Sequence, residues 1–293
     1  MEQKRYKRPK TFRGYSKKSR ALYTTQTVLA VLVTLVMLFP LYWMLISSLR
    51  PGEVLLGKSA NLLPTGFEWR NYLEAWTRVP LWRYIWNTIA VTAISMTIKI
   101  VGGVLAAYGF ANGRFPGRDI LFYVVLGATM VPHQVTFVPM YVICSRLGWV
   151  DTYAGLVFPG IVGAHFIFMM RQSFRSVDQS YIDAGRLDGL GVLGTIWYVM
   201  VPMCKASLIT MSLTTLIGQW NSYFWPKIIV KTDAARVLTV GLIHLRESWT
   251  GTEMWAHTNV TMAGAVIGML PAIVLFFMFQ KYMLTGYSKA SMK

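Results

Sequence analysis

Six long apolar runs, joined by polar and aromatic connections, dominate the pattern of the chain. They lie at about residues 26–48, 84–111, 120–143, 153–170, 199–220 and 260–284. Each is close to the ~20 residues that an α-helix needs to cross about 30 Å of hydrocarbon. Gly, Ser, Thr and Pro are scattered through the runs, as in membrane helices that pack on one another. The pattern predicts an all-α polytopic membrane protein with six transmembrane helices.

Composition supports a membrane location. Apolar residues make up 54% of the chain and charged residues only 14%, and the mean hydropathy is +0.43. A typical soluble domain carries about 25% charged residues. One aqueous core cannot hide this many apolar side chains, so lipid must be the solvent for many of them.

The net charge of +17 raises the possibility of nucleic-acid binding, but its distribution argues against that class of partner. Nine of the 29 basic residues precede Ala21, in a tail before the first apolar run. Such a tail orients a membrane protein with its N-terminus in the cytoplasm. With that orientation the inner connections carry a larger excess of basic over acidic residues than the outer ones. We expect both ends inside the cell, with cytoplasmic tails at residues 1–25 and 285–293 around a transmembrane domain at 26–284.

One motif match is rejected on its context. The segment from Gly52 to Ser59 fits the phosphate-loop pattern G-x-x-x-x-G-K-[ST]. That loop works between a strand and a helix, where backbone N–H groups converge on phosphate. Here a membrane helix precedes the segment, which would also lie on the face away from cytoplasmic ATP.

The inner connection, at about residues 172–198, carries the most informative polar pattern. It predicts a short polar helix that ends at Gly189 or Gly191, because glycine permits the left-handed turn that closes a helix. Asp183, Arg186 and Asp188 would form a charged knob on the cytoplasmic face. An ordinary solvated loop with one helical turn explains the residues equally well.

The same segment resembles the EAA loop of ABC-importer permeases, which reads E-A-A-x-x-D-G-A and is followed by a proline. The positions that match are Ala184, Asp188, Gly189 and Pro202. The positions that depart from the pattern are Asp183, Gly185 and Leu190. Gly185 in place of alanine should loosen the helix by ~1 kcal/mol.

The resemblance extends over about residues 25–284. Segments that begin at Met130, Leu147, Gly218 and Phe279 are similar to signatures of carbohydrate-type permeases. The chain looks most like the shorter six-helix subunit of the pairs that import maltose-type sugars or glycerol 3-phosphate. The resemblance implies a multi-pass permease in the cell membrane of a prokaryote. Its partners would be a second, homologous permease, two ATP-binding subunits and an extracytoplasmic solute-binding protein.

The family's mechanism implies that this chain is not an enzyme and binds no cofactor, because ATP and Mg²⁺ are used by the partner ATPase. A cytoplasmic coupling helix would sit in a cleft of one ATPase subunit and transmit its closure. The residues expected to couple are Asp183, Ala184, Gly185, Arg186, Asp188 and Gly189.

A polar face in the fifth run is a candidate for the substrate path. Its members follow three- and four-residue steps and would share one side of a helix: Ser207, Thr210, Thr214, Gly218 and Asn221. Such a face could line a path for sugar, or it could pack against another helix through Ser and Thr hydrogen bonds.

The outer loop before the sixth run is a candidate contact for the solute-binding protein. By resemblance it would reach outward with Glu247, Trp249, Glu253 and Trp255. The alternative is an aromatic belt at the membrane interface.

Lys99 lies inside the second run, where a charge costs about 3 kcal/mol unless it is paired or faces water. Structural pairing is favoured over a functional role. Pro132 and Pro139 predict a kink in the third run. His133 and His165 have no partners at ligand spacing, so no metal site is expected.

Two other classes of membrane protein fit the sequence less well. A secondary transporter driven by an ion gradient needs an intramembrane acid or a broken-helix ion site, yet all 12 acidic residues lie outside the predicted spans. An intramembrane enzyme needs a convergent nucleophile and base or a set of metal ligands. Only scattered histidines are available for either role.

Overall fold

The computed structural model describes residues 17–52, 62–63, 66–251 and 253–290, and within these ranges every regular element is a helix. Most of the predicted N-terminal tail, nearly all of the phosphate-loop match and the last three residues lie outside the described residues. The all-α prediction is therefore confirmed for the part of the chain that is described.

Three helices are long and apolar enough to cross a membrane unbroken. They are α1 (Lys17–Ser48), α4 (Leu81–Asn112) and α16 (Thr258–Ala290). Both α1 and α16 are longer than the apolar runs that predicted them. They extend into the expected tails because Lys, Arg, Ala and Met are good helix formers in water as well as in lipid.

The other three runs, expected to be single spanning helices, are broken pairs. α5 (Arg118–Ala128) and α6 (His133–Arg146) meet at 101°. α7 (Tyr153–Val157) with η2 (Phe158–Gly160) meets α8 (Ala164–Arg175) at 45°, and the segments Val192–Met203 and Lys205–Ile229 meet at 87°. Within the described residues the chain therefore has three unbroken candidate spans, or up to six if each pair counts as one.

Proline explains two of these breaks. Pro132 lies directly before α6 and has no N–H to continue the hydrogen bonds of α5. Pro202 lies in α11 (Val201–Met203), just before the bend at Cys204, and a π-helix (η3, Thr195–Met200) precedes it. The kink predicted from Pro132 is present, whereas Pro139 lies inside α6.

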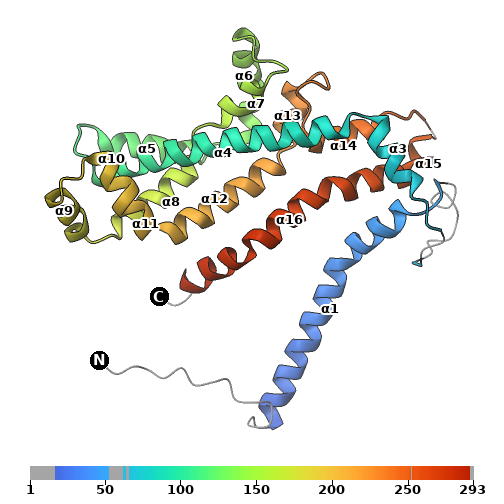
Figure 1. Cartoon of the computed structure of the whole chain (residues 1–293), viewed down its shortest axis with the longest axis horizontal. Coiled ribbons are helices and arrows are strands. Elements are labelled where there is room, and N and C mark those ends of the chain that lie inside the picture. Colours follow the sequence, from blue (N-terminus) through green and yellow to red (C-terminus); the bar gives the residue numbers. More distant parts are fainter. Residues whose placement is uncertain (1–16, 53–61, 64–65, 252, 291–293) are drawn as a thin grey trace.

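The shorter elements complete the chain (Figure 1). They are α3 (Arg70–Arg78), α9 (Gln179–Leu187), α10 (Val192–Gly194), α12 (Lys205–Trp220), α13 (Phe224–Ile229), α14 (Leu238–Glu247) and α15 (Glu253–Ala256). In Figure 1, α9 lies at the left end of α4, whereas α3, α14 and α15 lie toward its right end.

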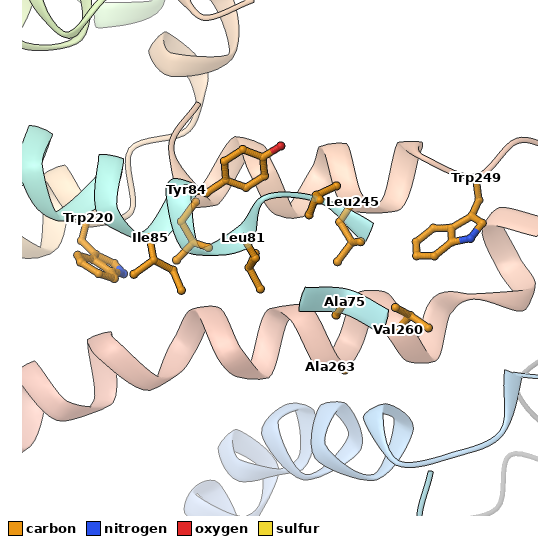
Figure 2. Packing of buried hydrophobic residues seen from close by; sticks show 11 residues of the cluster. Ala75, Leu81, Tyr84, Ile85, Trp220, Leu245, Trp249, Val260 and Ala263 are labelled. Carbon is orange, nitrogen blue, oxygen red and sulfur yellow. The ribbon is translucent and has the colours of Figure 1, made fainter. Parts of the chain in front are cut away.

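One buried apolar cluster joins α3, α4, α12, α14 and α16 (Figure 2). Tyr84, Leu81 and Leu245 are fully buried in it. A Cβ on Gly241 would lie 2.1 Å from the Tyr84 ring, so only glycine lets α14 approach α4 this closely. The cluster fixes the end of the bundle that carries α3, α14 and α15.

α1 packs on the rest of the molecule only near its C-terminal end. Burial begins around Trp43 and is complete at Ile46, Ser47 and Ser48, where α1 contacts α16. The preceding apolar residues are exposed on all sides, and Figure 1 shows this part of α1 diverging from the other helices. An all-apolar surface of this kind is typical of contact with lipid or with another membrane chain.

Candidate functional site

The predicted polar helix of the inner connection is present as α9, and its start is set by a side-chain cap. The Asp178 carboxylate accepts a hydrogen bond of 2.9 Å from the Ser180 N–H. This bond satisfies one of the backbone donors that a helix start leaves unpaired. It also stabilises the charged carboxylate and so lowers the pKa of Asp178.

Gly189, and not Gly191, ends α9. Gly189 has φ +80°, its N–H donates to Arg186 O at 3.0 Å, and the Leu190 N–H donates to Gly185 O at 2.9 Å. This pair of bonds is the Schellman arrangement, which requires a left-handed residue just after the helix. The sequence prediction of a glycine stop is therefore confirmed, and the loop alternative is wrong.

α9 packs through a narrow buried side. Ile182 is fully buried against residues of α8 and η3, and Gly185 is buried beside it. A Cβ on Gly185 would lie 3.3 Å from Val199 Cγ2 and 3.4 Å from Leu190 Cδ1. Gly185, which departs from the family pattern, thus allows η3 to lie close against α9. This close packing offsets the weaker helix propensity expected from the sequence.

The remaining candidate coupling residues lie on the exposed side of α9 or at its end. Asp183 and Arg186 are each 56% exposed and form an ion pair of 3.4 Å. Ala184, Asp188 and Gly189 are also exposed. Leu187 is 91% exposed, the most exposed large apolar side chain of the described residues. This side of the helix is a free surface of mixed charge and apolar character.

A cavity of about 770 Å³ lies among α4, α6, η2, α8, α12 and α13, where several helices break. Thr214, Gly218 and Asn221, three of the five predicted path residues, line it. Ser207 and Thr210 are not among its lining residues. The Thr210 hydroxyl donates to Ala206 O, one turn back in the same helix, at 2.9 Å, so this bond does not join α12 to another helix.

The cavity also contains polar groups that the helical pattern did not select. Lys99 of α4 donates from Nζ to Oε1 of Gln219 at 3.2 Å, and both residues line the cavity. His133 and His165 also line this cavity. The pairing favoured for Lys99 is present, but with a neutral amide. The sequence pointed to Lys99 as unusual because it is a charged residue within an apolar run. Only the fold shows that Lys99 faces a cavity.

Aromatic rings form the other part of the cavity wall. Phe137 of α6 and Trp225 of α13 lie with ring centroids 6.1 Å apart, and Tyr223 is also in the lining. Trp225 is held in place because its Nε1–H donates to Gly155 O at 2.8 Å. Flat aromatic faces with a few polar groups suit a ligand that has both apolar C–H faces and hydroxyls.

The four residues predicted to contact a binding protein differ in exposure. Glu247 and Glu253 are exposed at the end of α14 and the start of α15. Trp249 is only 5% exposed, with Arg78 5.2 Å above its ring and His257 stacked at 4.9 Å. Trp249 therefore packs within the chain and is not presented outward. Trp255 lies in α15, and its side chain is outside the described residues.

A polar clamp between two loops was not predicted. Asp151, at φ +59°, accepts hydrogen bonds from the N–H of Lys231 at 2.9 Å, the N–H of Thr232 at 3.0 Å and the Thr232 hydroxyl at 2.6 Å. Burial acts to raise the pKa of Asp151, but these bonds and the charge of Arg236 outweigh it and lower the pKa. The clamp fixes the loop before α7 to the loop after α13, beside the cavity.

The fold and the two candidate sites define a class: a multi-pass membrane protein with a helix-lined cavity and an exposed helix at one end. The family described as binding-protein-dependent transport system inner membrane component matches residues 99–288. The chain belongs to this family, which confirms the resemblance found in the sequence. Its members are transport subunits and not enzymes.

Curated relatives match along nearly the whole chain. The arabinooligosaccharides transport system permease protein AraQ of Bacillus subtilis (strain 168) is 26% identical and covers 91% of this chain and 94% of its own length. The probable ABC transporter permease protein YurM of the same organism is 28% identical, over 92% and 88%. The sn-glycerol-3-phosphate transport system permease protein UgpE of Yersinia pestis bv. Antiqua (strain Antiqua) is 27% identical, over 88% and 93%.

Solved structures share the fold. A chain of a bacterial ABC transporter involved in the import of the acidic polysaccharide alginate superposes with a TM-score of 0.82 at 24% identity, over 92% of this chain and 98% of that one. A second match, a chain from the complex of the alginate transporter with its pentasaccharide-bound periplasmic protein, has a TM-score of 0.58 at 14% identity, over 90% and 96%.

Proposed function

We propose that this chain is the membrane-spanning permease subunit of an ATP-driven, binding-protein-dependent carbohydrate importer in the cell membrane of a prokaryote. Family membership supports the transport role, and the names of the relatives support a carbohydrate or glycerol 3-phosphate as cargo. The aromatic and hydroxyl-bearing wall of the cavity suits such a cargo. The chain hydrolyses nothing in this proposal, because ATP and Mg²⁺ act in a partner subunit.

The proposed topology has six spans with both ends inside. α9 and the C-terminal end of α16 lie toward the same end of the bundle in Figure 1. α1 runs to its buried C-terminal end beside α3, at the opposite end of the bundle. This arrangement agrees with the basic excess of the inner connections. The exposed apolar part of α1 is then left to contact lipid or the second permease.

The single observation that carries the coupling proposal is the rigid attachment and free outer surface of α9. A capped start, a Schellman stop and a buried inner side hold the helix in one position on α8 and η3. Force applied to the exposed residues, including Asp183, Arg186 and Leu187, would therefore move the helices beneath. The chain's own contribution to the transport cycle is to carry ATPase closure from α9 to the cavity.

The substrate path in this proposal is the cavity lined by Thr214, Gly218 and Asn221. Broken helices at membrane depth are tolerated where they line a water-filled space or are buried in protein. Here the breaks of α5–α6 and α7–α8 border the cavity. Breaks also act as hinges, so rotation about them would open the cavity to one side or the other.

Co-purification of the tagged chain in mild detergent tests the assembly. We expect a second permease and an ATPase to be recovered with the wild-type chain. Both Asp188→Arg and Gly189→Val should lose the ATPase and retain the second permease, because they alter only the exposed end of α9. Recovery of the wild-type chain alone would contradict the proposed assembly, and recovery of the ATPase at the wild-type level by both variants would contradict the proposed coupling site.

A further inference from the structure

The cavity has a one-sided charge. Among its lining residues, all within the described part of the chain, Lys99, His133 and His165 are basic or can become so, and none is Asp or Glu. The ten acidic residues that the structure describes all lie elsewhere. A cavity with walls of one sign raises the local concentration of ligands of the opposite sign.

Lys99 is the one Lys or Arg side chain among the residues that line this cavity. An ammonium at membrane depth is costly unless it has a counter-charge or water. Its hydrogen-bond acceptor is the neutral Oε1 of Gln219, and no carboxylate of the described chain pairs with it. Because a lysine ammonium has three donors, a bond to Gln219 leaves donors for a ligand.

The helix starts at the cavity add to the same potential. His133 is the first residue of α6, and Gly163 directly precedes α8, and both line the cavity. A helix start carries a partial positive charge. Neither Pro132 nor Gly163, the residues before the two helices, has a side chain that could cap it.

We propose that this cavity selects carbohydrates that carry an anionic group, a carboxylate or a phosphate, and that Lys99 pairs with that group. The aromatic wall that includes Phe137 and Trp225 then contacts the sugar ring. The volume of about 770 Å³ falls in the range of roughly 300–1,000 Å³ that is typical of small-ligand sites. This inference rests on the proposed function, in which the cavity is the substrate path.

The test is equilibrium binding to the purified transporter complex in detergent, which excludes selection by the solute-binding protein. The first probe pair is digalacturonate and its dimethyl ester, which differ in charge and hardly in size. The second pair is maltose 1-phosphate and maltose. The acidic member of at least one pair should bind about ten-fold or more tightly than the neutral one, since a hydrogen bond to a charged group is at stake. The preferred pair distinguishes a uronate from a sugar phosphate.

Four variants separate an anion site from a structural lysine. Lys99→Met should remove the preference and Lys99→Arg should keep most of it. Gln219→Glu places a carboxylate where the amide now accepts the Lys99 hydrogen bond, so it should remove the preference while the complex stays as stable as wild type. Lys205→Met, at an exposed lysine outside the cavity lining, is the matched control and should leave the preference unchanged.

The outcomes that overturn the inference are distinct. Equal binding of the acidic and neutral probes by wild type, with both bound, refutes anion selection and leaves the proposed function standing. A second refuting outcome has two parts: Lys99→Met loses assembly, and Gln219→Glu keeps both assembly and selectivity. That result would assign Lys99 to the partner interface and refute anion selection. Failure of all four probes to bind refutes the inference, whereas the proposed function is tested separately by the co-purification of the second permease and the ATPase.

Discussion

Gly189 provides a sharp test of the coupling helix, because its backbone conformation disfavours any residue with a Cβ although the space around it is open. Its φ of +80° is left-handed, where a residue with a Cβ costs about 1–2 kcal/mol. A Cβ built there meets nothing within 4 Å, so the cost is backbone strain and not steric collision. We expect Gly189→Ala to disfavour the Schellman stop by that amount, about 5- to 30-fold in the population of the native helix end.

The assay is ATP-driven uptake of labelled substrate by the reconstituted complex, with ATP hydrolysis measured in parallel. Gly189→Ala should lower uptake per ATP hydrolysed while expression and membrane insertion stay normal. Gly189→Asn should fall between alanine and wild type, because Asn tolerates the left-handed region better.

Gly191 supplies the matched control. It lies two residues further along, has φ −69°, and a Cβ there also meets nothing within 4 Å. Gly191→Ala should therefore transport as wild type does. If Gly189→Ala is also indistinguishable from wild type, or if both alanine variants fail equally, the strained stop of α9 does not carry the coupling.

Two further predictions concern the stability of the purified chain. Gly241→Ala places a Cβ 2.1 Å from the Tyr84 ring, so overpacking should destabilise the chain by about 1–3 kcal/mol and lower its Tm. Gly102→Ala is the control, because a Cβ at Gly102 meets nothing within 4 Å and should leave the Tm unchanged. An unchanged Tm for Gly241→Ala would contradict the packing of α14 on α4. The Asp151 clamp has a folded pKa below the unfolded value of about 3.9, so its stabilisation is present above that pH and is lost as the pH falls through the folded pKa. The fall in Tm between pH 7 and pH 3 should therefore be smaller in Asp151→Asn than in wild type, and an equal fall would refute the clamp's contribution.

The elements that the sequence predicted are those controlled by local composition. The long apolar runs predicted α1, α4 and α16, and two glycines after a polar helix predicted a stop at Gly189 or Gly191, of which Gly189 is the one used. Both signals act over a few residues, through burial in lipid and through backbone freedom. The family resemblance rested on such local motifs as well, and it was confirmed.

The breaks and contacts that the sequence did not reveal depend on residues far apart in the chain. Lys99 and Gln219 are 120 residues apart, and Asp151 and Thr232 are 81 apart, so no periodicity could pair them. Trp249 illustrates the same limit. An aromatic residue in an outer loop suggests an exposed contact, but tertiary packing with Arg78 and His257 buries it.

The most direct test of the central claim is uptake by proteoliposomes that contain the chain with its co-purified partners, supplied with a solute-binding protein and an acidic or neutral oligosaccharide. The account predicts that uptake requires both ATP and the binding protein, continues when ion gradients are abolished, and falls in Gly189→Ala. Uptake by the chain alone, driven by an ion gradient without ATP, would contradict it.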